Sequence, residues 1–560
     1  MTLTIIAISF MVLLVAAYNL YGGWVARQFA LDDGRETPAH RVNDGEDYVP
    51  TSRFYLFGQH FSAIAAAGPI AGPILACQTF GWLPCLLWIG LGVVLIGAVH
   101  DFTSLTASVR HGARSIAEIT REHLGQRAGR AMMAFIWIAL IYVIIAFTDI
   151  TAGTFVSGTE ELQGTGIAFN AGGAVAFASI IYLLWSMILG LVERFLKPPL
   201  WLTTLIFVPG TFALSWLGTK YSTVFLLDHK VWAALILAYC AAASIVPVWA
   251  LLQPRGYLGG FVLYAALAVG VMGVLFGGYP IQQPAFKSWD VGGLNGTMFP
   301  FLFVTIACGA CSGFHGLVCS GTTSKQINRE TDMHAVGYGA MLAEGFVALI
   351  ALVTVMIATN EALKGKAPGA IYGQGIGNFL TLLIGKENLP FAITFGAMAF
   401  STFVFDTLDV CTRLGRYIMQ ELFGWRTRLG GFVGTLLTMG LPAIVVLYSP
   451  KGSWQDFWTL FGASNQLLAG LTLLSITVWL YQARQRIGFT LYPMLFVLTI
   501  TLWALIKLVI GNIRLANGFD VKLVNALAAA ALVSLALFVA ATAILKLRGE
   551  RNATLVPENA

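Results

Sequence analysis

Long apolar segments recur along the whole chain, and they constrain its fold more than any single motif does. A membrane-spanning helix needs about 20 mostly apolar residues, and the chain contains fifteen segments of that kind. Only 11% of the residues are charged, against about 25% in a soluble protein, so the surplus of apolar side chains must face lipid. We therefore predict an all-α polytopic membrane protein with about fifteen spans, at roughly 3–23, 58–78, 83–109, 130–157, 167–192, 198–218, 231–250, 256–277, 298–322, 335–358, 390–410, 429–448, 456–480, 491–512 and 523–545.

Lysine and arginine are distributed unevenly between the two sides that these spans define. The connections on one side carry 23 of them, those on the other side carry 9, and Lys507 lies within a span. Because short cytoplasmic loops are enriched in Lys and Arg, we predict that the N-terminus lies outside and the C-terminus in the cytoplasm. The first span lacks a basic leader and a clear A-x-A site, so it is predicted to be a retained helix rather than a signal peptide.

The segment 58–78 is apolar but carries two Gly-Pro pairs at its middle. Proline removes a backbone donor and clashes with the preceding turn. Broken backbone at membrane depth is tolerated only where it is buried in protein or lines a watery cavity, and in transporters it binds substrates and ions. A half-helix that restarts near Ile74 would direct unpaired N–H groups at a carboxylate; a purely structural kink is the alternative. The candidate substrate-binding residues here are His60, Gly68, Pro69, Gly72 and Pro73.

Interrupted or polar spans recur five spans apart, in opposite predicted directions. The span 231–250 contains Ser244 and Pro247 and is the counterpart of 58–78, and 298–322 is the counterpart of 130–157. This predicts a five-plus-five inverted repeat of the amino acid–polyamine–cation transporter type, with one extra N-terminal and four extra C-terminal helices; coincidence is the alternative. The corresponding division is a first repeat at 57–225, a second at 230–410 and accessory helices at 411–560, all within one transmembrane domain.

Polar residues within the spans supply further candidates. The segment 311–325 is dense in small and hydroxyl residues, which bind a small cation or a carboxylate well but also bond helices to one another. We predict that substrate contacts include Pro247, Ser312, His315, Asn465 and Gln466, and that Ser320, Thr322 and Thr323 are a possible cation site.

Ionisable residues within spans are expensive and usually functional. Five acids meet this description and are candidate proton carriers: Asp101, Asp149, Glu344, Asp406 and Asp409. Asp409 and Arg413 are four residues apart, so they can pair on one helical face. A structural ion pair is the alternative to a proton or gating role.

Several kinds of site have no support in the sequence. There is no Walker A loop, H-E-x-x-H motif or evident dinucleotide fingerprint. Cys308 and Cys311 form a lone C-x-x-C in an apolar span, where small packing residues are the better interpretation. We expect no cofactor and no bound metal, and because the basic residues are spread among loops, no nucleic-acid partner.

Six motifs follow one another along the chain: Asp47-Tyr-Val-Pro-Thr51, Phe57-Gly-Gln-His-Phe61 with the Gly-Pro pairs after it, Pro247-Val-Trp-Ala-Leu-Leu-Gln-Pro254, Ser320-Gly-Thr-Thr-Ser-Lys-Gln326, Thr407-Leu-Asp-Val-Cys-Thr-Arg-Leu-Gly-Arg-Tyr417 and Phe461-Gly-Ala-Ser-Asn-Gln466. In this order they resemble the carbon starvation protein A family. The resemblance covers residues from about 40 to 480 and implies a multi-pass secondary transporter of the bacterial inner membrane, linked to nutrient limitation. It also implies uptake of peptides, or of pyruvate with protons.

We therefore expect a symporter, not an enzyme, that imports a small carboxylate-bearing nutrient, pyruvate or a short peptide, with H⁺ as the coupling ion. Sodium coupling and, less favoured, an ion channel are the alternatives. An intramembrane enzyme using Ser312 and His315 lacks a third group in the sequence, and a sensor lacks an output domain. The sequence leaves the substrate, the stoichiometry and the oligomeric state open.

Overall fold

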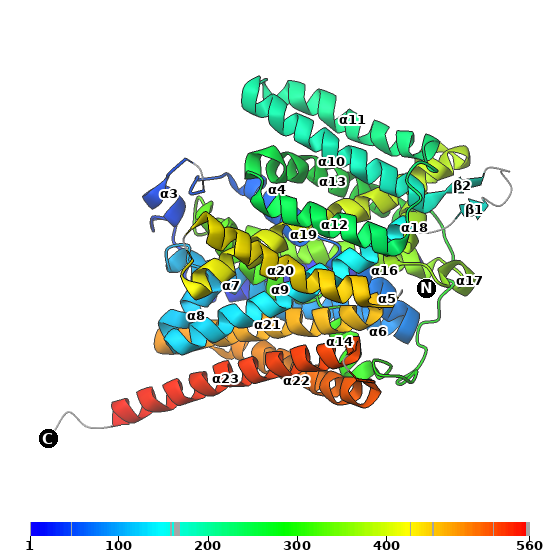
Figure 1. Cartoon of the computed structure of the whole chain (residues 1–560). Helices are drawn as coiled ribbons and strands as arrows, with labels where there is room; N and C mark the ends of the chain where they lie inside the picture. The colour runs from blue at the N-terminus through cyan, green and yellow to red at the C-terminus, as the bar shows by residue number, and fades with distance from the viewer. Residues whose placement is uncertain are drawn as a thin grey trace.

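The protein is a bundle of helices that run side by side, and its N-terminus and the end of its last helix lie at opposite ends of the bundle (Figure 1). The computed structural model describes residues 2–45, 47–156, 159–161, 168–425, 427–450, 453–518 and 520–555. Within these residues the only paired strands are β1 (Thr159–Glu161) and β2 (Ala168–Asn170), a short antiparallel pair between two helices. The predicted all-α polytopic class is confirmed.

Twelve of the fifteen predicted spans are helices long and apolar enough to cross a membrane. In chain order they are α1 (Leu3–Ala17) continuing through η1 (Tyr18–Gly22) into α2 (Gly23–Gln28), α6 (Trp82–Gly92) continuing through η2 (Val93–Gly97) into α7 (Ala98–Arg110), α9 (Gln126–Phe155), α10 (Ala171–Phe195), α11 (Leu200–Lys220), α13 (Leu252–Phe276), η5 (His334–Gly339) with α16 (Ala340–Met356), η6 (Lys386–Asn388) with α19 (Leu389–Phe423), α20 (Arg428–Tyr448), α21 (Trp454–Gln482), α22 (Gly488–Leu515) and α23 (Val521–Leu555).

The other three predicted spans are short or interrupted helices. The segment 58–78 lies in α4 (Arg53–Ile64) and α5 (Gly68–Phe80), which meet at a bend of 45°. The segment 298–322 is divided into α14 (Met298–Thr305) and α15 (Gly313–Gly321). The segment 231–250 is α12 (His229–Ile245), of 17 residues, followed by the 3-10 turn η3 (Val248–Ala250). The count of fifteen therefore includes three segments that are not uninterrupted long helices.

The connection 359–389 was expected to be a loop, and this expectation was wrong. It contains α17 (Asn360–Leu363) and α18 (Pro368–Ile384), and α18 packs against α19, α13 and α16. Its glycines allow this close approach, because a Cβ at Gly373 would lie 2.6 Å from the Cβ of Ala397. The glycine content that favours helix packing in a membrane also lowers helix propensity, which is why the sequence pattern did not indicate a helix.

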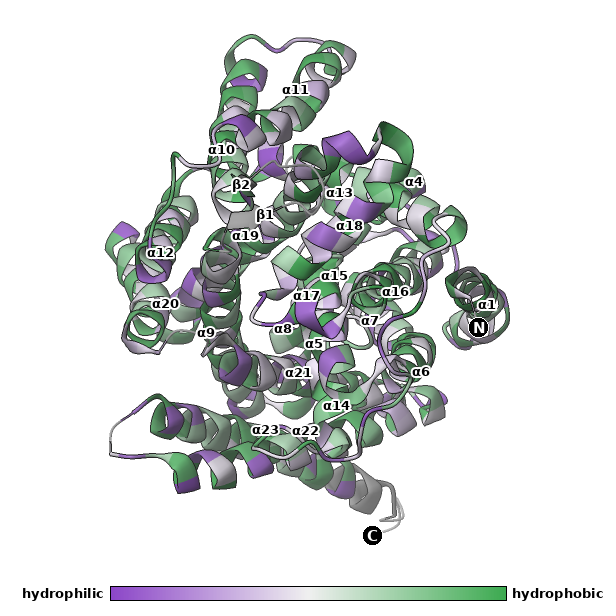
Figure 2. Cartoon of the chain, turned by 90° about the vertical axis from the view of Figure 1, so that its right-hand side faces the viewer, coloured by the Kyte–Doolittle hydropathy of each residue, from purple (hydrophilic) through white to green (hydrophobic). Residues whose placement is uncertain are grey.

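Burial separates central helices from peripheral ones. Within the most apolar stretch of each helix, 94% of α21 is buried in the protein, against 22% of α11 and 28% of α23. Figure 2 shows α1, the α10–α11 pair and the α22–α23 pair at the edge of the bundle, around a centre that includes α5, α15, α16 and α21. The remaining short helices, α3 (Pro38–Val42), α8 (Ile116–Leu124) and η4 (Thr323–Lys325), lie in the connections. The inverted repeat and the division at 57–225, 230–410 and 411–560 stay predictions.

Candidate functional site

The first interruption falls at Ala65–Ala67, before both Gly-Pro pairs. Ala65 leaves the helical region, with φ −73° and ψ 52°, and α5 restarts at Gly68. The predicted restart near Ile74 was therefore wrong: proline is well tolerated in the first turn of a helix, and Pro69 lies there. No side chain caps the start of α5. Pro69 has no N–H and the amide of Ile70 donates to the carbonyl of Ala67 at 3.2 Å, so the Gly68 amide is the one that the helix leaves over at the break.

The second interruption, between α14 and α15, lies directly against the first. A Cβ on Gly72 would be 2.6 Å from the carbonyl oxygen of Thr305, and a Cβ on Gly68 would overlap the side chain of Cys308. The half-helix α4 packs on α15, and α5 packs on α14. The two interrupted segments therefore run antiparallel and meet at their breaks, and the glycines allow the two backbones to touch.

Asn465 of α21 holds the second break in place. Its Oδ1 accepts a hydrogen bond from the backbone N–H of Phe314, at 2.9 Å, in the first turn of α15. Its Nδ2 donates to the hydroxyl of Ser312, at 3.0 Å, and lies 3.2 Å from the sulfur of Cys308. Asn465 is thus a cap supplied by another helix. The neighbouring Gln466 is 1% exposed, and both polar atoms of its carboxamide lack a hydrogen-bond partner among the described residues.

A buried chain of histidines and acids begins in the first turn after this break. His315 of α15 lies between two carboxylates: its Nδ1 is 2.8 Å from Oδ2 of Asp101, and its Nε2 is 3.2 Å from Oε2 of Glu344. The other oxygen of Asp101 is 2.7 Å from Nδ1 of His100. All four side chains are at most 2% exposed. The structure thus brings Asp101, His315 and Glu344 together from α7, α15 and α16.

His60 lies in the same region but has its own partner. The Nδ1 of His60 is 2.8 Å from the hydroxyl of Thr323. The hydroxyl of Ser320 instead donates to the carbonyl of Gly316 at 2.7 Å, and Thr322 is exposed. Ser320, Thr322 and Thr323 therefore face different surroundings, and the arrangement gives no support to a shared cation site.

Asp406 and Asp409 belong to a second buried cluster, built around Arg255 of α13. The side chain of Arg255 is 0% exposed; its Nε donates to Oδ1 of Asp406 at 2.8 Å, and Nη1 is 2.5 Å from Oδ2 of Asp409. The hydroxyl of Tyr239, on α12, donates to the same Asp409 oxygen at 2.9 Å. This network joins α12, α13 and α19, and sequence analysis missed it because Arg255 was counted as a loop residue.

The expected pairing of Asp409 with Arg413 was wrong. Arg413 donates instead to the backbone carbonyls of Ala243 and Val246, at 2.7 and 2.8 Å, at the end of α12. Arginine satisfies the orphan carbonyls that a helix leaves at its C-terminus. Pro247 was predicted to mark a break within a span. It directly follows this end of α12, which is far in the sequence from the two central breaks.

Asp149 lies in a third place, near the end of α9. Its Oδ1 is 3.3 Å from Nε2 of His229, the first residue of α12. The five predicted proton carriers therefore separate into three groups: Asp101 with Glu344 beside His315, Asp406 with Asp409 around Arg255, and Asp149 beside His229. Of these, only the first group is adjacent to an interrupted helix. Four partners were not predicted. Three of them, His229, Tyr239 and Arg255, come from distant segments and give no local sequence signal, whereas His100 directly precedes Asp101 and was overlooked.

The amino-acid sequence matches a known family. The family model for carbon starvation protein CstA matches residues 1–373 and 358–504. The chain belongs to the carbon starvation protein CstA family. This confirms the family resemblance and the association with membrane transport.

Several relatives of the CstA family have names that state an activity. The peptide transporter CstA of Bacillus subtilis is 33% identical, over 84% of this chain and 84% of the relative. The peptide transporter CstA of Campylobacter jejuni is also 33% identical, over 89% of this chain and 80% of the relative. The pyruvate/proton symporter BtsT of Escherichia coli is 31% identical, over 92% of this chain and 83% of the relative.

The likeness to solved structures is at low sequence identity. A mutant form of the manganese transporter of Eremococcus coleocola is 13% identical, with a TM-score of 0.47 over 91% of this chain and 99% of that chain. MhsT in complex with L-phenylalanine is also 13% identical, with a TM-score of 0.46 over 87% of this chain and 99% of that chain.

Proposed function

We propose that this CstA-family protein is a secondary active transporter that imports pyruvate or a short peptide together with protons. The names of the relatives supply the two substrate classes and, for BtsT, the proton. The observation that carries the proposal for this chain is the position of His315, between Asp101 and Glu344, in the first turn after a break at the centre of the bundle.

We infer one exchangeable proton from the contacts of this cluster, in which Asp101 is hydrogen-bonded to both histidines and Glu344 lies 3.2 Å from His315 without a hydrogen bond. An ionised carboxylate only accepts hydrogen bonds, so Asp101 is satisfied when His100 and His315 both carry their proton on Nδ1. The next proton then lies between Nε2 of His315 and Glu344. It forms either an imidazolium–carboxylate pair or a neutral imidazole beside a carboxylic acid, and gaining or losing it changes the charge of the cluster.

Substrate binding and this proton are linked through α15. The start of α5 has no side-chain cap, and the amide ends of half-helices suit an anionic group such as a carboxylate. Gln466, with its unsatisfied carboxamide, supplies a further polar contact. A carboxylate that settles at the breaks adds negative charge near the first turn of α15, and this favours the protonated state of the His315–Glu344 pair.

The test is uptake of labelled pyruvate and of a dipeptide into proteoliposomes under an inward proton gradient. For one proton per substrate, a gradient of about one pH unit sustains about tenfold accumulation. We expect Glu344→Gln to abolish accumulation but to retain substrate counterflow, because Gln preserves the shape of the side chain and cannot exchange a proton. Asp149→Asn is the matched control and is expected to retain accumulation.

Two outcomes would contradict this assignment. If Glu344→Gln accumulates substrate as the wild type does, Glu344 is not part of the proton pathway. If Asp149→Asn loses accumulation while Glu344→Gln keeps it, the pair with His229 is the coupling site instead. Uptake that depends on a sodium gradient and not on a proton gradient would overturn the coupling ion itself.

The geometry favours transport over chemistry. The hydroxyl of Ser312 is bonded to Asn465, and His315 contacts two carboxylates, so the Ser–His pair that an intramembrane hydrolase would need is not formed. We retain the proposal that the protein is not an enzyme, and that it lies in the bacterial inner membrane with its N-terminus outside and its C-terminus in the cytoplasm.

A further inference from the structure

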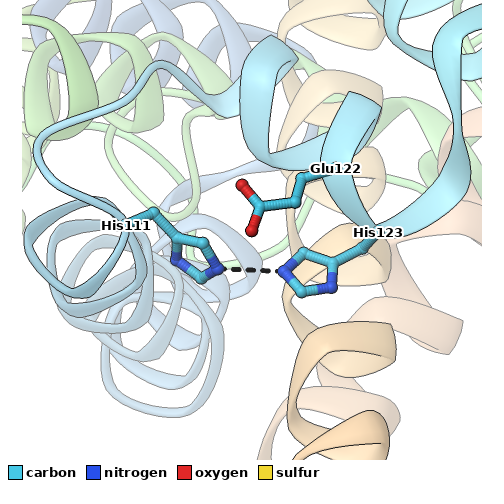
Figure 3. A group of neighbouring side chains, drawn as sticks. All are labelled: His111, Glu122 and His123. Atoms are coloured by element: carbon cyan, nitrogen blue, oxygen red, sulfur yellow. Dashed lines mark hydrogen bonds between the residues drawn. The ribbon is translucent and has the colours of Figure 1, made fainter.

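Three metal-ligating side chains meet at one end of the bundle, away from the central breaks. His111 is the first residue after α7, and Glu122 and His123 lie in the last turn of α8. Their ligand atoms all lie within 4.8 Å of one another. Figure 3 shows the two imidazole rings facing each other through their Nε2 atoms, 2.9 Å apart, with the Glu122 carboxylate beside them.

The other nitrogen of each ring fixes its tautomer. Nδ1 of His111 lies 2.7 Å from the carbonyl oxygen of Ala107, and a carbonyl can only accept, so this Nδ1 carries a proton. Nδ1 of His123 lies 2.6 Å from Oε1 of Gln482, on α21, and a carboxamide oxygen likewise only accepts. In the neutral form, both Nε2 atoms are therefore bare lone pairs.

Two lone pairs that face each other at 2.9 Å repel unless a positive charge lies between them. A shared proton or a metal ion can supply that charge. Glu122 favours the metal, because it adds a carboxylate oxygen within 4.8 Å of the imidazole nitrogens. Its Oε2 also accepts from Arg114 at 2.5 Å, and a carboxylate has room for both partners.

We propose that His111, His123 and Glu122 bind a divalent first-row transition metal ion of the zinc class. Imidazole nitrogen and carboxylate oxygen are typical zinc ligands, and three protein ligands leave a fourth position for water. Here water has access, because the Glu122 side chain is 43% exposed. Tetrahedral coordination with Zn–N of about 2.0–2.1 Å places the two nitrogens about 3.3 Å apart, so the rings need to separate by only a few tenths of an ångström.

The outer contacts of the two rings are those of metal-bound histidines. Such histidines nearly always donate their second N–H to a carbonyl, carboxylate or water, as His111 does to Ala107 and His123 to Gln482. The ion would join the end of α7 to α8 directly, and to α21 through Gln482. Since Ile116 of α8 donates its amide to Ser320 of α15, the site is connected to the half-helix that carries His315.

The test is metal binding by the purified full-length protein in lipid nanodiscs. After removal of metals with EDTA, we expect one Zn²⁺ per chain, and a visible absorption band of tetrahedral type when Co²⁺ replaces it. His111→Gln and His123→Gln are each expected to weaken binding by at least about 100-fold, and Gln482→Ala, which changes only an outer contact, by about 10-fold. His40→Gln removes a different histidine, bonded to Asn328, and is expected to change nothing.

The proposal fails if the wild type binds Zn²⁺ no more tightly than the His111→Gln/His123→Gln double variant. That result would mean that the two rings share a proton instead. It also fails if His40→Gln lowers the affinity as much as His111→Gln does. The substitutions lie at the end of the bundle, so thermal unfolding in EDTA should be unchanged in all variants, and Zn²⁺ should raise the midpoint only where the site is intact.

Discussion

Replacing Arg255 tests the buried ion network most directly. Its side chain is fully buried and holds Asp406 and Asp409 through contacts of 2.8, 2.7 and 2.5 Å. Arg255→Met preserves much of the volume but leaves the buried carboxylate of Asp409 and the partly exposed carboxylate of Asp406 without a counter-charge. Breaking a buried ion pair in this way costs about 3–5 kcal/mol.

This free energy can be converted into a melting temperature. The entropy of unfolding is about 2.1 cal/mol/K per residue, which for a chain of this length gives about 1.2 kcal/mol/K. The midpoint of thermal unfolding should therefore fall by about 2.5–4 °C. The assay is tryptophan fluorescence in detergent at one fixed scan rate, because unfolding of a membrane protein is usually irreversible and its midpoint then depends on the rate of heating.

Two further variants distinguish lost attraction from uncompensated charge. The triple variant Arg255→Met/Asp406→Asn/Asp409→Asn has no buried charge left at this place, so it should recover at least half of the loss. Arg514→Met removes an exposed arginine and should leave the midpoint unchanged. If Arg255→Met melts within about 1 °C of the wild type, or if the triple variant melts no higher than Arg255→Met, the reasoning is wrong.

Three further predictions concern the breaks and their surroundings. Gly72→Ala places a Cβ 2.6 Å from a backbone carbonyl of the facing break. Uptake in proteoliposomes should therefore fall at least tenfold, and the free energy of unfolding should fall by about 1–3 kcal/mol. Gly440→Ala is the control and should transport normally, because its Cβ meets nothing within 4 Å. Asn465→Ala leaves the amide of Phe314 without its acceptor, which costs about 1–3 kcal/mol, so the midpoint of thermal unfolding measured by fluorescence should fall. The midpoint of Asn465→Asp should fall less, because Asp keeps the acceptor. Gln466→Leu should leave the midpoint unchanged or raise it, because no hydrogen bond is lost, while the KM for substrate rises by about tenfold; an unchanged KM would remove Gln466 from the binding site.

The spans and the central site could be predicted in outline because they depend on composition and on backbone chemistry. A run of about 20 apolar residues must cross the membrane, and Gly-Pro pairs within it favour an interruption, although α5 continues through Gly72-Pro73. The sequence therefore placed a break in 58–78 but misjudged its position by several residues. The reason is that proline in the first turn starts a helix rather than ending it. The shape of the break also depends on Ala65–Ala67, which adopt the irregular backbone between the two helices.

The partners of the charged groups could not be predicted, because each pair is formed by tertiary structure. Asp409 has Arg413 four residues away on its own helix, yet it pairs with Arg255, on a helix far earlier in the chain. Arg413 is drawn instead to the free carbonyls at the end of α12. In the same way, His111 and His123 are separated by a turn and a helix, so no regular ligand spacing indicated that they meet.

The distribution of thiols makes the chain a reporter of its own transport cycle. All seven cysteines are free and buried, and a thiol without access to water reacts slowly with alkylating reagents. Cys308, Cys311 and Cys319 line the second break and the first helix beyond it. Their rate of modification by a small maleimide therefore measures the fraction of time that the binding region is hydrated. An impermeant maleimide applied from one face, and then from the other, divides that time between the outward-open and inward-open conformations without the introduction of any new cysteine.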